Sequence, residues 1–141
     1  MRRTTTIIAV LVAALIAGSC GGGSDVTTQS AVAIIDSDLL GDGNYTGSGS
    51  YTVIEAQRAY STQAGATAVA ARVSVPGEDS LCLFWYVGGH NPGEGLIIGD
   101  NVTRYYSVWS AAASVGSPAN DTVKALKATP EGKAVIAASG C

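Results

Sequence analysis

The sequence predicts an α+β domain, in which a small antiparallel sheet packs with amphipathic helices and one C-terminal disulfide closes the fold. Three observations carry this prediction. Apolar residues alternate over 67–87 around a turn signal, as in a β-hairpin. Apolar residues recur at helical spacing before and after that hairpin. Two cysteines, Cys82 and Cys141, lie far apart in the 141-residue chain, which is long enough for one domain with a single core.

Two helices are expected before the hairpin. The apolar residues of 26–40 are spaced for a helix, although the alternation over 32–36 fits a strand as well. Thr52 and Glu55 have the spacing of a capping box, in which a hydroxyl and a carboxylate three residues apart bind free backbone amides. A helix over 53–64 is therefore expected to follow.

The hairpin is expected over 67–87, with a turn at 76–79 where Pro and Gly occur together. Its first strand places one set of apolar residues on one face, namely Val69, Ala71, Val73 and Val75. Its second strand is apolar without interruption over 81–87, which predicts burial on both faces and an interior position in the sheet. The apolar residues 96–98 predict a short third strand.

Helices are expected again after the sheet. Residues 102–113 carry apolar side chains at helical spacing, and Asn101 is placed to cap them. A second helix is expected from Pro118, with an acidic residue early and lysines late, as the helix dipole favours. Residues 129–131 interrupt it. The final segment, 134–138, fits a helix or a short strand, and its alanine content favours the helix.

The N-terminus has the features of an export signal. Arg2 and Arg3 precede an uninterrupted apolar run of 11 residues, 7–17. This run is shorter than the roughly 20 residues that span a bilayer and fits the apolar region of a signal peptide. Small residues follow and lead directly to Cys20. The arrangement resembles the lipobox of bacterial lipoproteins, which implies cleavage before Cys20 and diacylglycerol attachment to its thiol.

Ala17 stands where the lipobox usually has Leu. Cleavage near Ser19 as an ordinary secretory signal and retention as an uncleaved anchor are therefore the alternatives. On the lipoprotein interpretation, residues 1–19 are the signal peptide, 20–30 are the lipidated Cys and a flexible Gly/Ser tether, and 31–141 are one globular domain. Two acyl chains hold a protein stably at a membrane, so we expect the domain to lie at the extracytoplasmic face of the cell membrane.

Charge and cysteine content limit the remaining possibilities. The mature chain would hold six basic and eleven acidic residues, a formal charge of −5, and it has no basic patch. Nucleic acid is therefore not an expected partner. With Cys20 lipidated, Cys82 and Cys141 form an even pair in an oxidising compartment, which predicts a disulfide. A metal-binding or catalytic thiol is the alternative, but the chain has no CxxC and a single His.

Two segments are candidates for binding or catalysis. The loop 88–95 is rich in glycine and contains His90 and Glu94, which could act as a base and its orienting acid. The same composition also fits an exposed turn with no chemical role. Asp36, Asp38 and Asp42 offer oxygen ligands for calcium, yet their spacing departs from an EF-hand, and a solvated loop explains them equally well.

The expected function is a binding or interaction role for a membrane-anchored extracytoplasmic lipoprotein, with an envelope protein as a possible partner and no cofactor. No catalytic constellation is recognisable, so enzymatic activity is not expected. The first alternative is a small envelope hydrolase or ligand-processing enzyme that uses His90 and Glu94. The second is a surface assembly subunit, because a helix over 53–64, a meander and a C-terminal disulfide resemble pilin-like domains. The pilin peptidase motif, however, is absent from the N-terminus.

Overall fold

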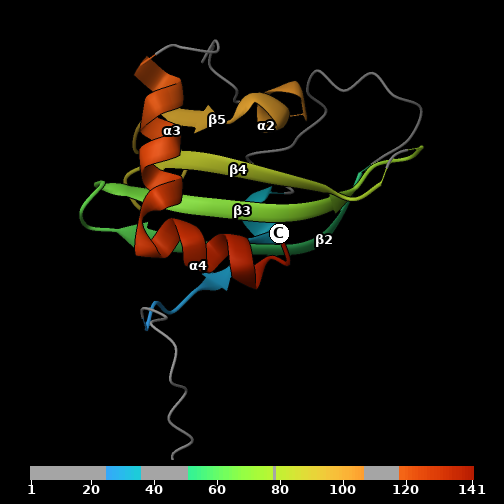
Figure 1. Ribbon diagram of the computed structural model, residues 1–141, viewed down its shortest axis with the longest axis horizontal. Helices are drawn as coiled ribbons and strands as arrows, with labels where there is room; N and C mark the ends of the chain where they lie inside the picture. The colour runs from blue at the N-terminus through green and yellow to red at the C-terminus, as the bar shows by residue number, and fades with distance from the viewer. Residues whose placement is uncertain (1–24, 36–50, 78, 107–117) are drawn as a thin grey trace, which may run out of the picture.

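The fold is built on one five-stranded antiparallel meander in which every strand pairs with its neighbour in sequence (Figure 1). The computed structural model describes residues 25–35, 51–77, 79–106 and 118–141. The strands are β1 (Gln29–Ser30), β2 (Thr52–Ser61), β3 (Ala66–Ser74), β4 (Leu81–Gly88) and β5 (Ile97–Gly99). The helices are α1 (Val32–Ile34), α2 (Asn101–Tyr106), α3 (Pro118–Ala128) and α4 (Pro130–Ala138).

The predicted α+β class and the central hairpin are confirmed. β3 and β4 pair antiparallel from Thr67 with Val87 to Val73 with Leu81, and β5 is the expected third strand. β4 lies between β3 and β5 and is buried on both faces, since Phe84 and Trp85 point in opposite directions and are both almost inaccessible to solvent. The uninterrupted apolar run therefore identified an interior strand correctly.

The helix expected over 53–64 is wrong, because these residues form the strand β2. β2 pairs with β3 over nearly its whole length, from Thr52 with Ser74 to Ser61 with Ala66. Gly65, at φ +61°, lies in the turn that joins the two strands. Pairing with the apolar β3 buries Ala56, Ala59 and Ser61. This burial outweighs the local helical pattern that Thr52 and Glu55 create.

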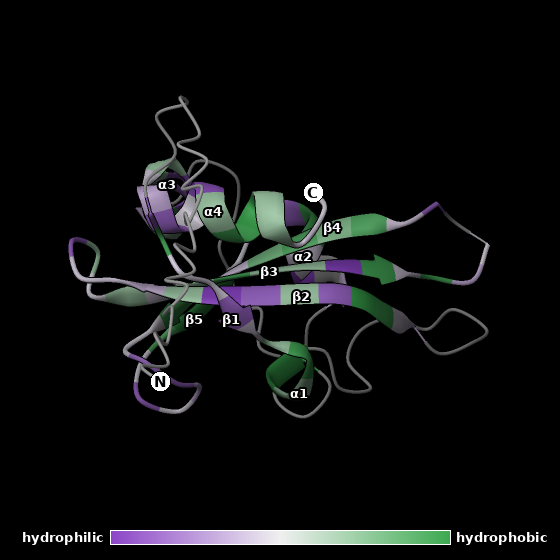
Figure 2. Ribbon diagram, turned by 90° about the horizontal axis from the view of Figure 1, so that it is seen from below, coloured by the Kyte–Doolittle hydropathy of each residue, from purple (hydrophilic) through white to green (hydrophobic). Residues whose placement is uncertain are grey.

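The sheet separates two apolar layers, and β3 contributes to both (Figure 2). Its alanines face α3 and α4, where small side chains let the helices lie close to the sheet: Ala66, Ala68 and Ala70. Val69, Ala71 and Val73 of β3 face the opposite layer beside α1, and Val75, which follows the strand, lies in the same layer, as the sequence predicts. The two faces of the sheet therefore have different side-chain volumes as well as different partners.

α3 and α4 cover one face of the sheet and join through Thr129. Its hydroxyl accepts a hydrogen bond from the backbone N–H of Gly132 at 3.1 Å, so Thr129 caps α4 and Pro130 occupies the first turn. The expected break at 129–131 is confirmed, and residues 134–138 are helical. Gly132 lies against the end of α3, since a Cβ there would be 2.1 Å from the carbonyl oxygen of Leu126.

Asp100, rather than the expected Asn101, caps α2. Its carboxylate accepts the backbone N–H of Thr103 at 2.9 Å and also pairs with Lys127 of α3 at 2.5 Å. The Thr103 hydroxyl in turn accepts the backbone N–H of Phe84 at 2.6 Å. One acidic residue thus joins β5, α2 and α3. The rest of the helix predicted over 102–113, beyond Tyr106, lies outside the described residues.

The predicted disulfide between Cys82 and Cys141 is present, with Cα atoms 5.7 Å apart. It joins β4 to the residue that follows the turn at the end of α4, as the position of the C-terminus in Figure 1 indicates. The link closes a loop with a sequence separation of 59 residues. It therefore holds α4, the last element of the chain, against the sheet.

Candidate functional site

The loop after β4 is held in shape by the carboxylate of Glu94. One oxygen accepts the backbone N–H of His90 at 2.7 Å, and the other accepts the side-chain amide of Asn91 at 2.8 Å. The backbone N–H of Glu94 donates back to the carbonyl of Asn91 at 3.2 Å. The hydrogen bond from the Asn91 side chain, followed by the one from the His90 backbone, lowers the pKa of Glu94 below its usual value of 4.5.

Gly89 is required for this arrangement. Its φ of +81° lies in the region that other residues rarely adopt, and a Cβ at this position would be 2.6 Å from an oxygen of the Glu94 carboxylate. The loop is also fixed to the sheet from outside. Oγ1 of Thr67 donates to the carbonyl of Gly89 at 2.8 Å and lies 3.2 Å from that of His90. The glycine-rich composition therefore builds a defined loop.

The structure brings His90 and Glu94 into contact, but Glu94 binds the backbone N–H of His90 and not its imidazole. The hydrogen bonds of the Glu94 carboxylate go to the His90 N–H and to Asn91. The imidazole stacks instead on the ring of Tyr60, with centroids 3.7 Å apart and planes inclined by 22°. In this geometry Glu94 shapes the loop, whereas an orienting acid would have to bind the imidazole itself.

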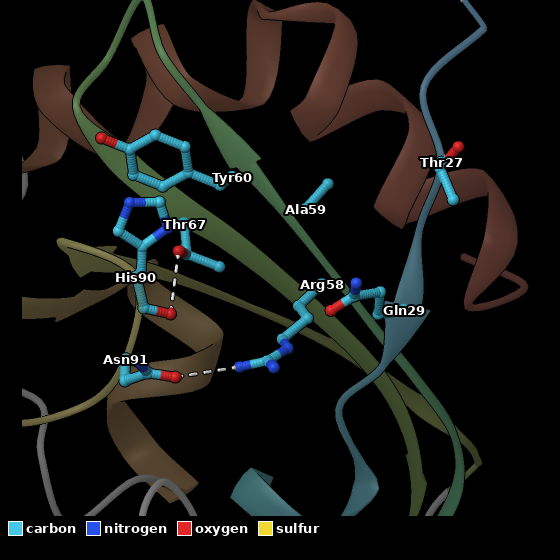
Figure 3. Close-up of a pocket in the computed structure, with 8 residues that line it drawn as sticks. All are labelled: Thr27, Gln29, Arg58, Ala59, Tyr60, Thr67, His90 and Asn91. Carbon is cyan, nitrogen blue, oxygen red and sulfur yellow. Dashed lines mark hydrogen bonds between the residues drawn. The ribbon is translucent and has the colours of Figure 1, made fainter.

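A pocket of about 330 Å³ opens beside this loop (Figure 3). It lies between the chain that leads into β1, the end of β2 and the residues that follow β4. Most of its lining is polar, and none of the lining side chains is a carboxylate: Thr27, Gln29, Arg58, Ala59, Tyr60, Thr67, His90 and Asn91. The stacked Tyr60 and His90 form one wall, and Gln29 and Thr27 lie across from them in the close-up.

Arg58 is the cationic group of this pocket. One nitrogen of its guanidinium donates to Oδ1 of Asn91 at 3.3 Å. Because the other end of the Asn91 amide donates to Glu94, its oxygen is turned toward Arg58. Among the described residues that line the pocket there is no carboxylate, and the side-chain partner of Arg58 is the neutral amide of Asn91. A chain of hydrogen bonds from Glu94 through Asn91 thus positions the guanidinium at the pocket.

Most of these pocket residues were not identified from the sequence. His90 was, because it is the single histidine of the chain and lies in a glycine-rich segment. The helix predicted over 53–64 contains Arg58 and Tyr60, and the tether predicted over 20–30 contains Thr27 and Gln29. The residues have no recognisable spacing, since register brings them together: Gln29 pairs with Arg58, and Tyr60 pairs with Thr67. The alternation of residues 56–60, which is typical of a strand, is the one sequence signal for this placement of Arg58 and Tyr60.

The remaining predicted residues divide into two groups. Cys82 and Cys141 are joined, as described above. Cys20 and the calcium candidates Asp36, Asp38 and Asp42 lie outside the described residues. Within the described ranges, no three His, Cys, Asp or Glu side chains gather closely enough to hold a metal ion. No helix in that part of the chain has the length and apolar character to cross a membrane.

Comparison of the chain with known protein families, with curated protein sequences and with solved structures gave no match. The site must therefore be interpreted from its own geometry. That geometry comprises a preformed polar pocket with one cation and a wall of stacked rings.

Proposed function

We propose that this protein is an exported lipoprotein, anchored to the membrane through Cys20, whose extracytoplasmic domain acts by binding. The Cys82–Cys141 disulfide is the observation that carries this proposal. Disulfides persist in oxidising compartments outside the cytoplasm, which agrees with an export signal. Because this bond uses two of the three cysteines of the chain, Cys20 is the remaining one, and two small residues separate it from the apolar segment.

The binding role is supported by the shape and chemistry of the pocket. The hydrogen bonds of Glu94, Asn91 and Thr67 fix the loop before any ligand arrives, which reduces the entropy lost on binding. A volume of about 330 Å³ is at the lower end of small-molecule sites. Because the Glu94 carboxylate is committed to the loop, the site supports binding better than acid–base catalysis by His90 and Glu94.

The anchor is tested by mass spectrometry of the protein isolated from the membrane of a bacterial host. We expect a chain that begins at a diacylglyceryl-modified Cys20, and we expect Cys20→Ala to release the domain from the membrane fraction. An intact N-terminus, or an unmodified Cys20 in a membrane-bound protein, would refute the anchor. The Cys82→Ala/Cys141→Ala variant is the matched control, because it removes the two disulfide-bonded cysteines and leaves Cys20 in place.

A further inference from the structure

We propose that the pocket beside β2 binds a small anion through Arg58, that is, a compact molecule that carries a carboxylate or phosphate group. This inference rests on the proposed binding role and adds the ligand class. A guanidinium presents five N–H donors in a planar fork that matches both oxyanions. One of the donors of Arg58 contacts Asn91 at 3.3 Å, so most of the fork is available to a ligand.

The charges around the pocket favour an anion over a cation or a neutral ligand. Arg58 brings one positive charge, and no carboxylate lines the pocket. The nearest acidic group in the loop, Glu94, directs both oxygens at loop donors. The whole chain carries a formal charge of −3, so a positive pocket is a local feature, distinct from the general field of the protein.

The neighbours of Arg58 can complete such a site. Gln29 lies opposite Arg58 in the β1–β2 register and lines the same pocket with its side-chain amide. The polar residues Thr27 and His90 also line this cavity (Figure 3). Polar neutral donors around one guanidinium are typical of oxyanion recognition, because several N–H and O–H groups can share the bound charge.

A contrasting hollow of similar size, about 340 Å³, lies between α2 and α3. There a carboxylate lines the hollow, and Asp100 pairs with Lys127 at 2.5 Å beside a second lysine, Lys124. Arg58, by contrast, is held by a neutral amide. A protein can position a cation without cancelling its charge in this way, which preserves the charge for a ligand.

The test uses the single histidine of the chain as an internal probe. The protein is purified with its native N-terminus in a non-ionic detergent, with its histidine labelled with carbon-13, and the imidazole C–H signals of His90 are followed by NMR. Inorganic phosphate is titrated in one series and succinate in another, with sodium chloride at equal ionic strength as the control. We expect a saturable shift with phosphate or succinate and none with chloride; the responding series identifies the anion.

Arg58→Gln should lower the affinity for the anion that gives a shift roughly tenfold or more, because a charged hydrogen-bond donor is lost. Arg58→Lys keeps the charge without the fork and should give an intermediate affinity. Lys133→Gln removes the same charge from an exposed position on α4 and should change affinity by less than about twofold. Thermal unfolding of each variant establishes that it is folded.

Two results would overturn the inference. One is the lack of a saturable shift with either anion up to high millimolar concentration. The other is equal affinity in the wild type and in a folded Arg58→Gln variant. Either result would leave the lipid anchor untouched, because mass spectrometry tests that separately. A partner captured from the native envelope by the anchored protein would then support binding of a macromolecule in place of a small anion.

Discussion

The disulfide offers the most direct test of how the last helix is held on the sheet. We consider the variant Cys82→Ala/Cys141→Ala, which removes the cross-link and avoids a free thiol. Both residues are exposed to solvent, so the loss of two sulfur atoms leaves no cavity in the core. The change in stability should therefore report the cross-link itself, acting mainly on the unfolded chain.

The size of the effect follows from the length of the closed loop. For a sequence separation of 59 residues, the chain-entropy relation gives a stabilisation of about 4 kcal/mol at room temperature. The packing of α4 on β2 and β3 remains in the variant, with Val135 fully buried. We therefore expect the variant to fold with α4 in place, but with a free energy of unfolding lower by about 3–4 kcal/mol.

Urea unfolding of the oxidised wild type and the double variant measures this difference. The variant should show a lower midpoint and a larger m value, because its unfolded chain is free to expand. Reduction of the wild type should reproduce the midpoint of the variant, which serves as the control for the substitutions. Equal midpoints for the variant and the oxidised wild type would refute the reasoning, as would two free thiols at Cys82 and Cys141 in peptide mapping.

Two further predictions concern the packing of the helices and the loop at the pocket. Gly132→Ala should destabilise the protein by about 2 kcal/mol despite the better helix propensity of alanine, because the new Cβ meets backbone atoms of Leu126 and Lys127. Lys133→Ala is the exposed control, and thermal unfolding that shows Gly132→Ala unchanged or stabilised would contradict the close contact. Glu94→Gln should lower the thermal midpoint at neutral pH. The lowered pKa of Glu94 means that its carboxylate contributes stability above about pH 4.5, the unfolded value, and loses it as the pH falls through the folded pKa. The gap between the two proteins should therefore close in acid, and a gap independent of pH would contradict the role assigned to the carboxylate.

The difference between β2 and the helix expected there has a specific physical cause. The residues of 52–61 satisfy two local patterns, since Thr52 and Glu55 fit a capping box while every second residue fits a strand face. The apolar spacing of so short a segment does not separate these possibilities. Pairing of β2 with β3 decides in favour of the strand, because Ala56 and Ala59 become buried on opposite faces of the sheet only in the extended conformation.

The pocket shows the same limit. Its cation, Arg58, and its stacked ring, Tyr60, are two residues apart on β2. The residues that contact them in the pocket lie far away in the sequence, with Gln29 before them and the loop that holds His90 after them. A loop rich in glycine and asparagine could be recognised from the sequence, and so could its single histidine. The Glu94 carboxylate binds donors within its own loop, whereas the stacking of the imidazole on Tyr60 depends on the pairing of distant strands.

The sequence by itself determined the features that depend on neighbouring residues and on composition. These are the hairpin over 67–87 with its buried second strand, the break between α3 and α4, and the pairing of the two cysteines of the domain. The tertiary structure alone decided the strand β2 and the pocket around Arg58. Local patterns fix a segment only where one conformation satisfies them, and elsewhere the choice is made by the burial that pairing with distant strands provides.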